Sequence, residues 1–181
     1  MTRIIGISGS LRAGSFNTAL LRTARALIPD TLELGSIRGI PLYDADVEAA
    51  EGVPRVVEQL KEQIARADGL LLATPEYNNS MPGVFKNAVD WLSRPPADIA
   101  RVFHGKAVAI IGASPGGFGT ILAQNAWLTV LRTLKTRPWL EGRLMVSGAQ
   151  RLFDQHGELR DEKTRDQLEA FIHGFVAFAQ R

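Results

Sequence analysis

Short apolar runs alternate along this chain with longer segments whose apolar residues recur at helical spacing. The apolar runs cover residues 3–8, 31–34, 69–73, 107–111 and 144–146, and the helical segments cover 15–27, 54–67, 82–92, 120–134 and 161–179. This alternation is typical of βαβ units, which assemble into a parallel sheet with helices on both faces. We therefore expect an α/β fold with a doubly wound, five-stranded parallel sheet, in which residues 1–181 form a single domain.

The composition argues against several functional classes. Because the sequence contains no Cys, it excludes a disulfide framework, a thiolate metal site and a cysteine nucleophile, so redox chemistry would need a bound cofactor. The 21 basic and 19 acidic side chains give a net charge of only +2 without a basic tract, which argues against nucleic-acid binding. The apolar run at the amino terminus is too short for a signal peptide, and no stretch reaches transmembrane length. We expect a cytoplasmic protein without membrane insertion.

The segment 9–17, GSLRAGSFN, joins the first predicted strand to the first predicted helix. Ligands of open parallel sheets bind beyond the carboxyl ends of the strands, where this segment lies. Its glycines let the backbone curl, and the exposed N–H groups of a helix start favour an anion. Ser10, Ser15 and Asn17 add short donors and Arg12 adds a positive charge, which together favour a terminal phosphate. The simpler alternative is an ordinary turn with Ser15 as the helix N-cap.

Two familiar phosphate motifs do not fit this segment. Ser15 stands where a Walker A loop has its Lys, which argues against an NTPase. The glycines fall at positions 6, 9 and 14 and miss the G-x-G-x-x-G spacing of dinucleotide-binding sheets. A mononucleotide therefore fits the segment better.

Two further segments at the same edge of the sheet suit a flat ring. The segment 74–83 contains two Pro and the aromatic Tyr77, so it can form a stiff wall with main-chain donors; alternatively, Tyr77 packs into the core. The segment 112–120 has three Gly in four positions from Gly116, which lets a planar ligand lie against the backbone; alternatively, it is only a flexible connection. One segment for a phosphate and two for a ring predict a mononucleotide with a flat head group.

Together these motifs resemble the NADPH-dependent FMN reductase family, which includes quinone- and chromate-reducing members. The resemblance rests on GISGSLRAGSFN at 6–17, PEYN at 75–78 with Pro82 and KNAVDW at 86–91, and GASPGG at 112–117, and it extends over essentially the whole chain. It implies a flavodoxin-like fold, one bound FMN, NADPH or NADH as co-substrate, and a small-molecule acceptor such as a quinone. Hydride transfer would then be carried by FMN without a catalytic side chain.

The resemblance also assigns roles to single residues. It implies that FMN is bound by Ser10, Arg12, Ser15, Phe16, Asn17, Pro75, Glu76, Tyr77, Asn78, Ser114, Gly116 and Gly117. The resemblance implies that the phosphate is held by Ser10, Arg12, Ser15 and Asn17. It places the residues from 75 to 78 along the ribityl chain and the ring, and Ser114, Gly116 and Gly117 at the pyrimidine side. The helix from Pro82, with an apolar stripe that includes Trp91, is implied to lie in a subunit interface, so we expect a homodimer or a homotetramer.

Two other functions stay open at this point. A flavodoxin-type electron carrier would bind FMN without NAD(P)H activity, although such carriers are typically strongly acidic and this chain is not. A serine hydrolase is suggested by G-x-S-x-G around Ser114, with Asp154 and His156 or Asp161 and His173 completing a triad. However, the residue after Ser114 is Pro115, which lacks the N–H that an oxyanion hole needs there.

Two groups of polar residues carry weaker signals. The three histidines, His104 among them, show no ligand spacing, and we expect no metal site. The basic cluster of Arg132, Lys135 and Arg137 is typical of a solvated helix end, with contact to the phosphates of NADPH as the alternative.

Overall fold

A parallel sheet with the strand order β2-β1-β3-β4-β5 forms the centre of the molecule. The computed structural model describes residues 2–181. Its strands are β1 (Ile4–Ser8), β2 (Leu32–Gly35), β3 (Gly69–Ala73), β4 (Ala107–Ala113), β5 (Arg137–Pro138) and β6 (Leu144–Val146). Its helices are α1 (Phe16–Leu27), α2 (Ala45–Glu51), α3 (Arg55–Arg66), α4 (Gly83–Leu92), α5 (Ile99–Val102), α6 (Ile121–Thr133) and α7 (Glu162–Ala179), with 3₁₀ turns η1 (Pro96–Asp98) and η2 (Ala149–Arg151).

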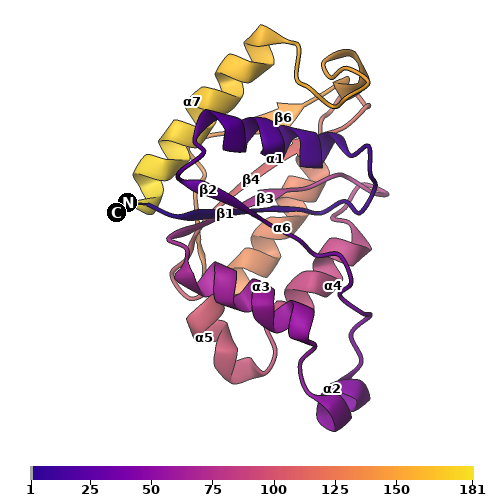
Figure 1. Ribbon diagram of the computed structural model, residues 1–181, viewed down its shortest axis with the longest axis vertical. Coiled ribbons are helices and arrows are strands. Elements are labelled where there is room, and N and C mark those ends of the chain that lie inside the picture. The colour runs from indigo at the N-terminus through magenta and orange to yellow at the C-terminus, as the bar shows by residue number, and fades with distance from the viewer. Residues whose placement is uncertain (1) are drawn as a thin grey trace.

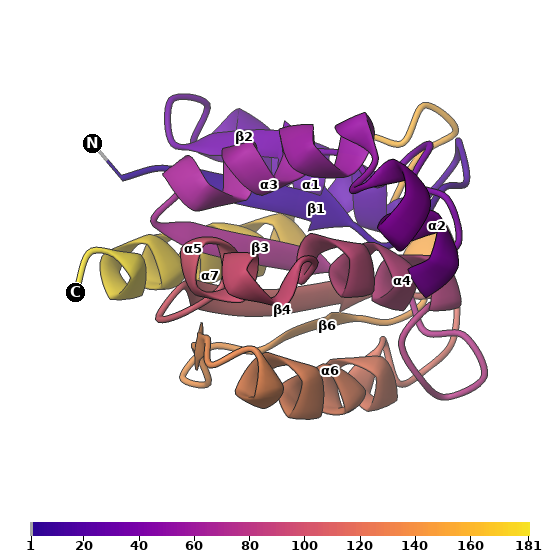
Figure 2. The same cartoon turned by 90° about the horizontal axis from the view of Figure 1, so that it is seen from below.

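Helices cover both faces of the sheet, as expected for a doubly wound fold. Figures 1 and 2 show α1 and α7 on one face and α3, α4 and α6 on the other. The central strand β3 is buried along its whole length, because its run of leucines packs into both layers. This arrangement confirms the predicted flavodoxin-like fold and brings the connections after β1, β3 and β4 to one edge of the sheet.

The fifth position of the sheet is shared by two short strands. β5 pairs with the start of β4, where Val108 lies opposite Pro138, and β6 pairs with its end, where Ala113 lies opposite Val146. The sequence predicted β6 but not β5, because a two-residue strand that contains Pro leaves no apolar run. The short helix α2 was also missed, since none of its residues is buried and no helical stripe marks it.

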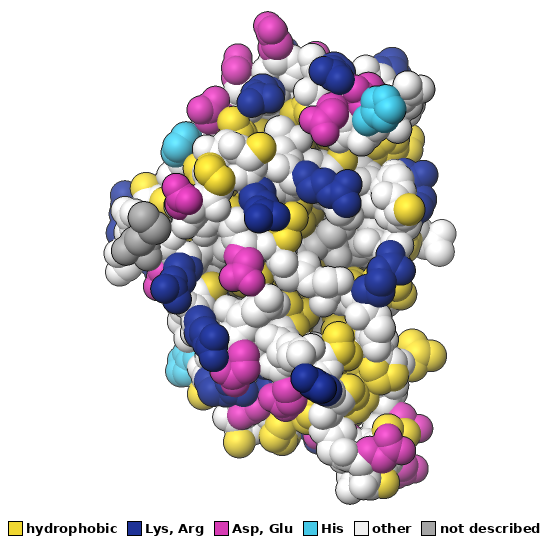
Figure 3. All heavy atoms as spheres, in the orientation of Figure 1, with side chains coloured by type: hydrophobic (Ala, Val, Ile, Leu, Met, Phe, Trp, Pro, Cys, Tyr) yellow, Lys and Arg dark blue, Asp and Glu magenta, His cyan; other side chains and the backbone are white. Residues whose placement is uncertain are grey.

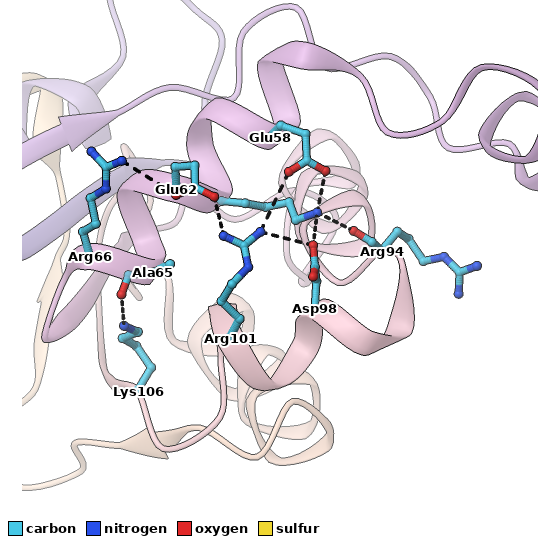
Figure 4. Close-up of polar contacts among 9 residues, drawn as sticks. Glu58, Glu62, Ala65, Arg66, Arg94, Asp98, Arg101 and Lys106 are labelled. Atoms are coloured by element: carbon cyan, nitrogen blue, oxygen red, sulfur yellow. Dashed lines mark hydrogen bonds and ion pairs between the residues drawn. The ribbon is translucent and has the colours of Figure 1, made fainter.

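A buried lysine fastens α3 to the segment that follows α4. The Lys61 side chain is fully buried, and its Nζ lies 2.7 Å from Glu58 Oε1, 2.5 Å from Asp98 Oδ2 and 2.8 Å from the Arg94 carbonyl oxygen (Figure 4). The hydrogen bond from Lys61 is the main cause of the lowered pKa of Asp98. Arg101 extends this network to Glu62. The buried charge is therefore paired, and its partners connect α3 with η1 and with the residues just after α4.

Candidate functional site

The first loop, residues 9–15, links β1 to the start of α1. The Gly9 N–H donates to the Ala73 carbonyl oxygen at 2.9 Å, which fastens the loop to β3. Ser15 is the N-cap of α1, and its Oγ accepts from the Thr18 N–H at 3.2 Å. Several main-chain N–H groups at this helix start have no acceptor within residues 2–181, namely those of Leu11, Ala13, Gly14, Phe16 and Asn17. Such a group of free amides is suited to bind an anion.

Arg12 is the cation of this loop. Its guanidinium donates to the Gly14 carbonyl oxygen and lies 5.4 Å from the centre of the Phe16 ring, which itself packs against Phe153. The Ser10 Oγ accepts from the Arg12 N–H at 3.4 Å. Within the described chain, no carboxylate forms an ion pair with Arg12, so its charge remains available to a ligand.

Asn17 joins the first loop to the end of β4. Its side chain is 3% exposed, its Nδ2 donates to the Ala113 carbonyl oxygen at 2.9 Å, and its Oδ1 accepts from the Ala113 N–H at 2.9 Å. The sequence predicted Asn17 as a phosphate donor, but the amide group is engaged with Ala113. Asn17 can therefore contact a phosphate only through its main-chain N–H group.

The second loop, residues 74–82, presents an aromatic side chain on a tight turn. The main chains of Tyr77 and Ser80 pair at 3.0 and 3.1 Å around Asn78 and Asn79, whose φ angles are 49° and 62°. Asn tolerates this left-handed conformation better than most residues. Tyr77 is 48% exposed, so the alternative that it packs into the core is wrong, whereas Pro75 beside it is buried. The N–H groups of Glu76 and Asn78 have no acceptor within residues 2–181.

Glu76 links the second loop to α6. Its Oε2 accepts from the N–H groups of Leu122 at 2.9 Å and Ala123 at 3.0 Å, which satisfies two free donors in the first turn of α6. Sequence reasoning missed this cap, because the two ends lie 46 residues apart. The Glu76 carboxylate thereby holds the second loop against α6, the helix that follows the third loop.

The third loop, residues 114–120, has a fixed base and an open tip. The Ser114 N–H donates to the Val146 carbonyl oxygen at 2.9 Å, and its Oγ donates to the Gly119 carbonyl oxygen at 2.5 Å. At the tip, the N–H groups of Gly116 and Gly117 have no acceptor in the described part of the chain, and a Cβ on Gly117 would meet nothing within 4 Å. The tip can therefore offer main-chain donors to the edge of a flat ligand.

These three loops can be compared with known proteins. The model of the family described as NADPH-dependent FMN reductase matches residues 2–151. The chain belongs to this family. It is 47% identical to an NAD(P)H-dependent FMN reductase of Pseudomonas aeruginosa and 42% identical to a quinone reductase of Escherichia coli, in both cases over 99% of this chain and 96% of the relative. The flavoenzyme FerB, an NAD(P)H:acceptor oxidoreductase of Paracoccus denitrificans, has a similar structure, with a TM-score of 0.87 at 33% identity over 99% of this chain and 98% of that one.

The donor groups of this FMN reductase fit the cofactor of its family. Free amides and Arg12 at the first loop suit the dianionic phosphate of FMN. The second loop adds an exposed aromatic ring and free amides, and the open tip of the third loop adds the amides of Gly116 and Gly117. The polar side chains of Glu76 and Asn17 do not occupy these free amides. Glu76 accepts from the start of α6, and Asn17 donates to the Ala113 carbonyl oxygen.

The hydrolase alternative for this FMN reductase is wrong. Ser114 donates its hydroxyl proton to a carbonyl oxygen, and no hydrogen bond joins it to a histidine among residues 2–181. The Asp154 carboxylate accepts from the main chain of His156 rather than from its ring. Asp161 caps the first turn of α7, and the ring of His173 lies 3.9 Å from a carboxylate on its own helix. Neither predicted pair forms a relay toward Ser114.

Replacing Ser114 with alanine is expected to leave quinone reduction within roughly tenfold of the wild type. The substitution removes one neutral hydrogen bond, worth about 0.5–1.5 kcal/mol, and leaves the amides of the third loop in place. Steady-state assays with NADPH and a quinone check the rate, and a fluorophosphonate probe checks nucleophilicity. Stoichiometric labelling of Ser114 in the wild type would restore the hydrolase alternative.

The basic cluster at the end of α6 lies away from the three loops. Arg137 pairs with Ala107 at the amino end of β4, and its guanidinium lies 4.4 Å from the centre of the Phe178 ring. The Gly105 N–H donates to the Lys135 carbonyl oxygen just before β4 begins. Because the loops lie at the carboxyl ends of the strands, this cluster does not reach a ligand that they bind. Of the two interpretations of this basic cluster, the geometry supports the solvated helix end.

Proposed function

We propose that this protein is an NAD(P)H-dependent, FMN-containing oxidoreductase that reduces a quinone, a flavin or another small acceptor. The supporting observation is the row of three loops at one edge of the sheet, which together present free amides, Arg12 and the exposed ring of Tyr77. FMN held by these loops would supply the redox chemistry, which is hydride acceptance from a nicotinamide and electron transfer to the acceptor. The protein has to bind the FMN, orient it and tune its electronic properties.

The proposed roles of the residues follow from their positions. Ser10, Arg12 and Ser15, with the main chain at Phe16 and Asn17, hold the phosphate. The second loop, from Pro75 to Asn78, lies along the ribityl chain and the ring, with Glu76 keeping it against α6. Ser114 shapes the third loop, whose Gly116 and Gly117 amides would serve as donors to the pyrimidine edge of the flavin and would favour negative charge there. No side chain of this set is needed as an acid or a base.

A homodimer or homotetramer in the cytoplasm completes the proposal. Within one chain Phe85, Ala88 and Trp91 of α4 are buried, so the stripe predicted from them packs internally. Val84 of the same helix is 39% exposed and lies near the exposed Tyr77 in sequence, which makes this end of α4 the part that a second subunit would cover. No helix among residues 2–181 is long and apolar enough to span a bilayer.

Anaerobic titration distinguishes this reductase from a flavodoxin-type carrier. The FMN-loaded protein is mixed with one equivalent of NADPH without oxygen, and the flavin absorbance near the visible maximum is recorded. The reductase is expected to bleach within seconds and to recover when a quinone is added, because both reactants reach the same ring. A carrier would bleach only with a protein donor or dithionite, and a flavin spectrum unchanged by NADPH and NADH would contradict the proposal.

A further inference from the structure

A cavity of about 750 Å³ lies between strand β6, at the edge of the sheet, and helix α7 (Figure 1). The buried side chains of Leu144 and Phe171 make part of its lining apolar. The exposed side chains of Arg143, Lys163 and Gln167 make another part polar. The cavity shares no residue with the three loops, so it is separate from the proposed flavin site.

The charges around this cavity are of one sign. Arg143 and Lys163 line it, and none of the described residues in its lining is acidic. Neither cation forms an ion pair within residues 2–181. On the face of the molecule in Figure 3, by contrast, Lys and Arg side chains stand among Asp and Glu side chains. Two cations in a lining without acidic residues favour a ligand with a negative charge.

Trp139 adds a buried hydrogen-bond donor to the same lining. Its side chain is 8% exposed, and its Nε1 is the one buried side-chain polar atom without a hydrogen-bond partner among residues 2–181. The other two indole N–H groups are paired, that of Trp91 with the Pro41 carbonyl oxygen at 3.0 Å and that of Trp127 with Thr74 Oγ1 at 3.1 Å. A buried indole N–H usually has a partner, because burying it without one costs free energy. The N–H of Trp139 therefore calls for an acceptor from outside the chain.

The N–H edge of the Trp139 ring lies on the side of this cavity. A Cβ on Gly174 would lie 2.9 Å from Trp139 Cζ2, and a Cβ on Gly142 would lie 3.0 Å from the same atom. Cζ2 and Nε1 are both bonded to Cε2, so they share one edge of the ring. Gly174 lines this cavity but not the neighbouring one beside α6, which places that edge on the α7 side. The Phe171 ring holds the indole there, edge to face, with the ring centres 4.8 Å apart.

We infer that this cavity binds a small carboxylate with an apolar body. The apolar body lies against Leu144 and Phe171. The carboxylate accepts from the Trp139 N–H and is attracted by Arg143 and Lys163. This ligand site is an addition to the proposed redox function and does not depend on it, because the cavity and the three loops have no residue in common.

NMR of the indole N–H groups tests the site without turnover. FMN-loaded protein that contains ¹⁵N-labelled tryptophan gives three indole signals, and the signal of Trp139 is the one lost in Trp139→Phe. Adding 2-naphthoate is expected to shift the Trp139 signal downfield as its N–H gains an acceptor. The signals of Trp91 and Trp127 are internal controls and should stay in place, because both N–H groups already have acceptors within the chain.

Two comparisons test the role of charge, with the same signal as the readout. The uncharged 2-naphthamide has the same rings and is expected to bind at least about tenfold more weakly than 2-naphthoate. Lys163→Ala is expected to weaken 2-naphthoate binding roughly fivefold, as for the loss of an exposed charge pair. Arg165→Ala is the matched control, because Arg165 is exposed on the same helix but does not line the cavity. It should leave the affinity unchanged.

Three outcomes would overturn the inference. A Trp139 signal that stays in place at high 2-naphthoate concentration would show that its N–H gains no acceptor. Equal affinity for 2-naphthoate and 2-naphthamide would show that the cations do not recognise the ligand. A shift of the Trp127 signal instead would assign the binding to the flavin site, because Trp127 donates to Thr74 at the start of the second loop. None of these outcomes bears on the reduction of FMN by NADPH, so the proposed function is tested separately.

Discussion

Replacing Gly112 with alanine is expected to destabilise the fold by roughly 2–3 kcal/mol and to displace the third loop. A Cβ at this position would lie 1.8 Å from Thr120 Oγ1 and 2.5 Å from the Thr74 carbonyl oxygen. Both threonines are fully buried, and Thr74 Oγ1 also accepts from the Trp127 indole N–H at 3.1 Å, so neither can retreat without further losses. Urea unfolding followed by circular dichroism measures the change, and FMN titration measures the effect on the loop.

Gly117→Ala is the matched control for this substitution. It introduces the same methyl group into the same loop, but nothing lies within 4 Å of its Cβ. We expect a change within about 0.5 kcal/mol, as for surface positions without special features. Equal stability of the two variants would show that Gly112 is not packed between the two threonines as described.

Removing the Asn17 side chain is expected to cost roughly 2–4 kcal/mol of stability. Asn17→Ala deletes two hydrogen bonds and leaves the N–H and the carbonyl oxygen of buried Ala113 without their partner. For a chain of this length, the loss corresponds to a thermal midpoint lower by roughly 5–12 °C. FMN affinity should also fall, because Asn17 joins the phosphate loop to the end of β4, from which the third loop starts. Differential scanning calorimetry and flavin titration check the two parts.

Asn125→Ala controls for the loss of an amide side chain from a helix. Asn125 is exposed on α6 and has no side-chain hydrogen bond within residues 2–181. The thermal midpoint of the Asn125→Ala variant should therefore differ from that of the wild type by no more than about 2 °C. If Asn17→Ala were as stable as Asn125→Ala, the contact between the first loop and β4 would not contribute to the stability of the fold.

Local patterns were sufficient to predict most of the scaffold. The run of leucines in β3 and the helical spacing in α1, α3, α6 and α7 each mark one element, and alternation of the two kinds leads to the parallel sheet. The three loops were found because Gly, Pro, Ser and Asn concentrate at the carboxyl ends of strands. These signals are local in sequence, so one chain suffices to read them.

The contacts between the loops could not be predicted in this way. Asn17 meets Ala113 across 96 residues, and Glu76 meets Leu122 across 46, so no spacing in the sequence marks either pair. Asn17 was predicted as a phosphate donor from its residue type, and Glu76 was implied as a cofactor ligand by the family resemblance, yet both side chains brace the scaffold.

Identification of the flavin released from the purified protein tests the proposed site most directly. The first loop offers a single group of free amides at one helix start, which suits one terminal phosphate, and the other two loops suit one ring system. After reconstitution with excess flavin and removal of the unbound fraction, chromatography of the heat-released cofactor is expected to show FMN at about one molecule per chain. FAD in its place would contradict this expectation. The absence of any retained flavin would contradict it outright.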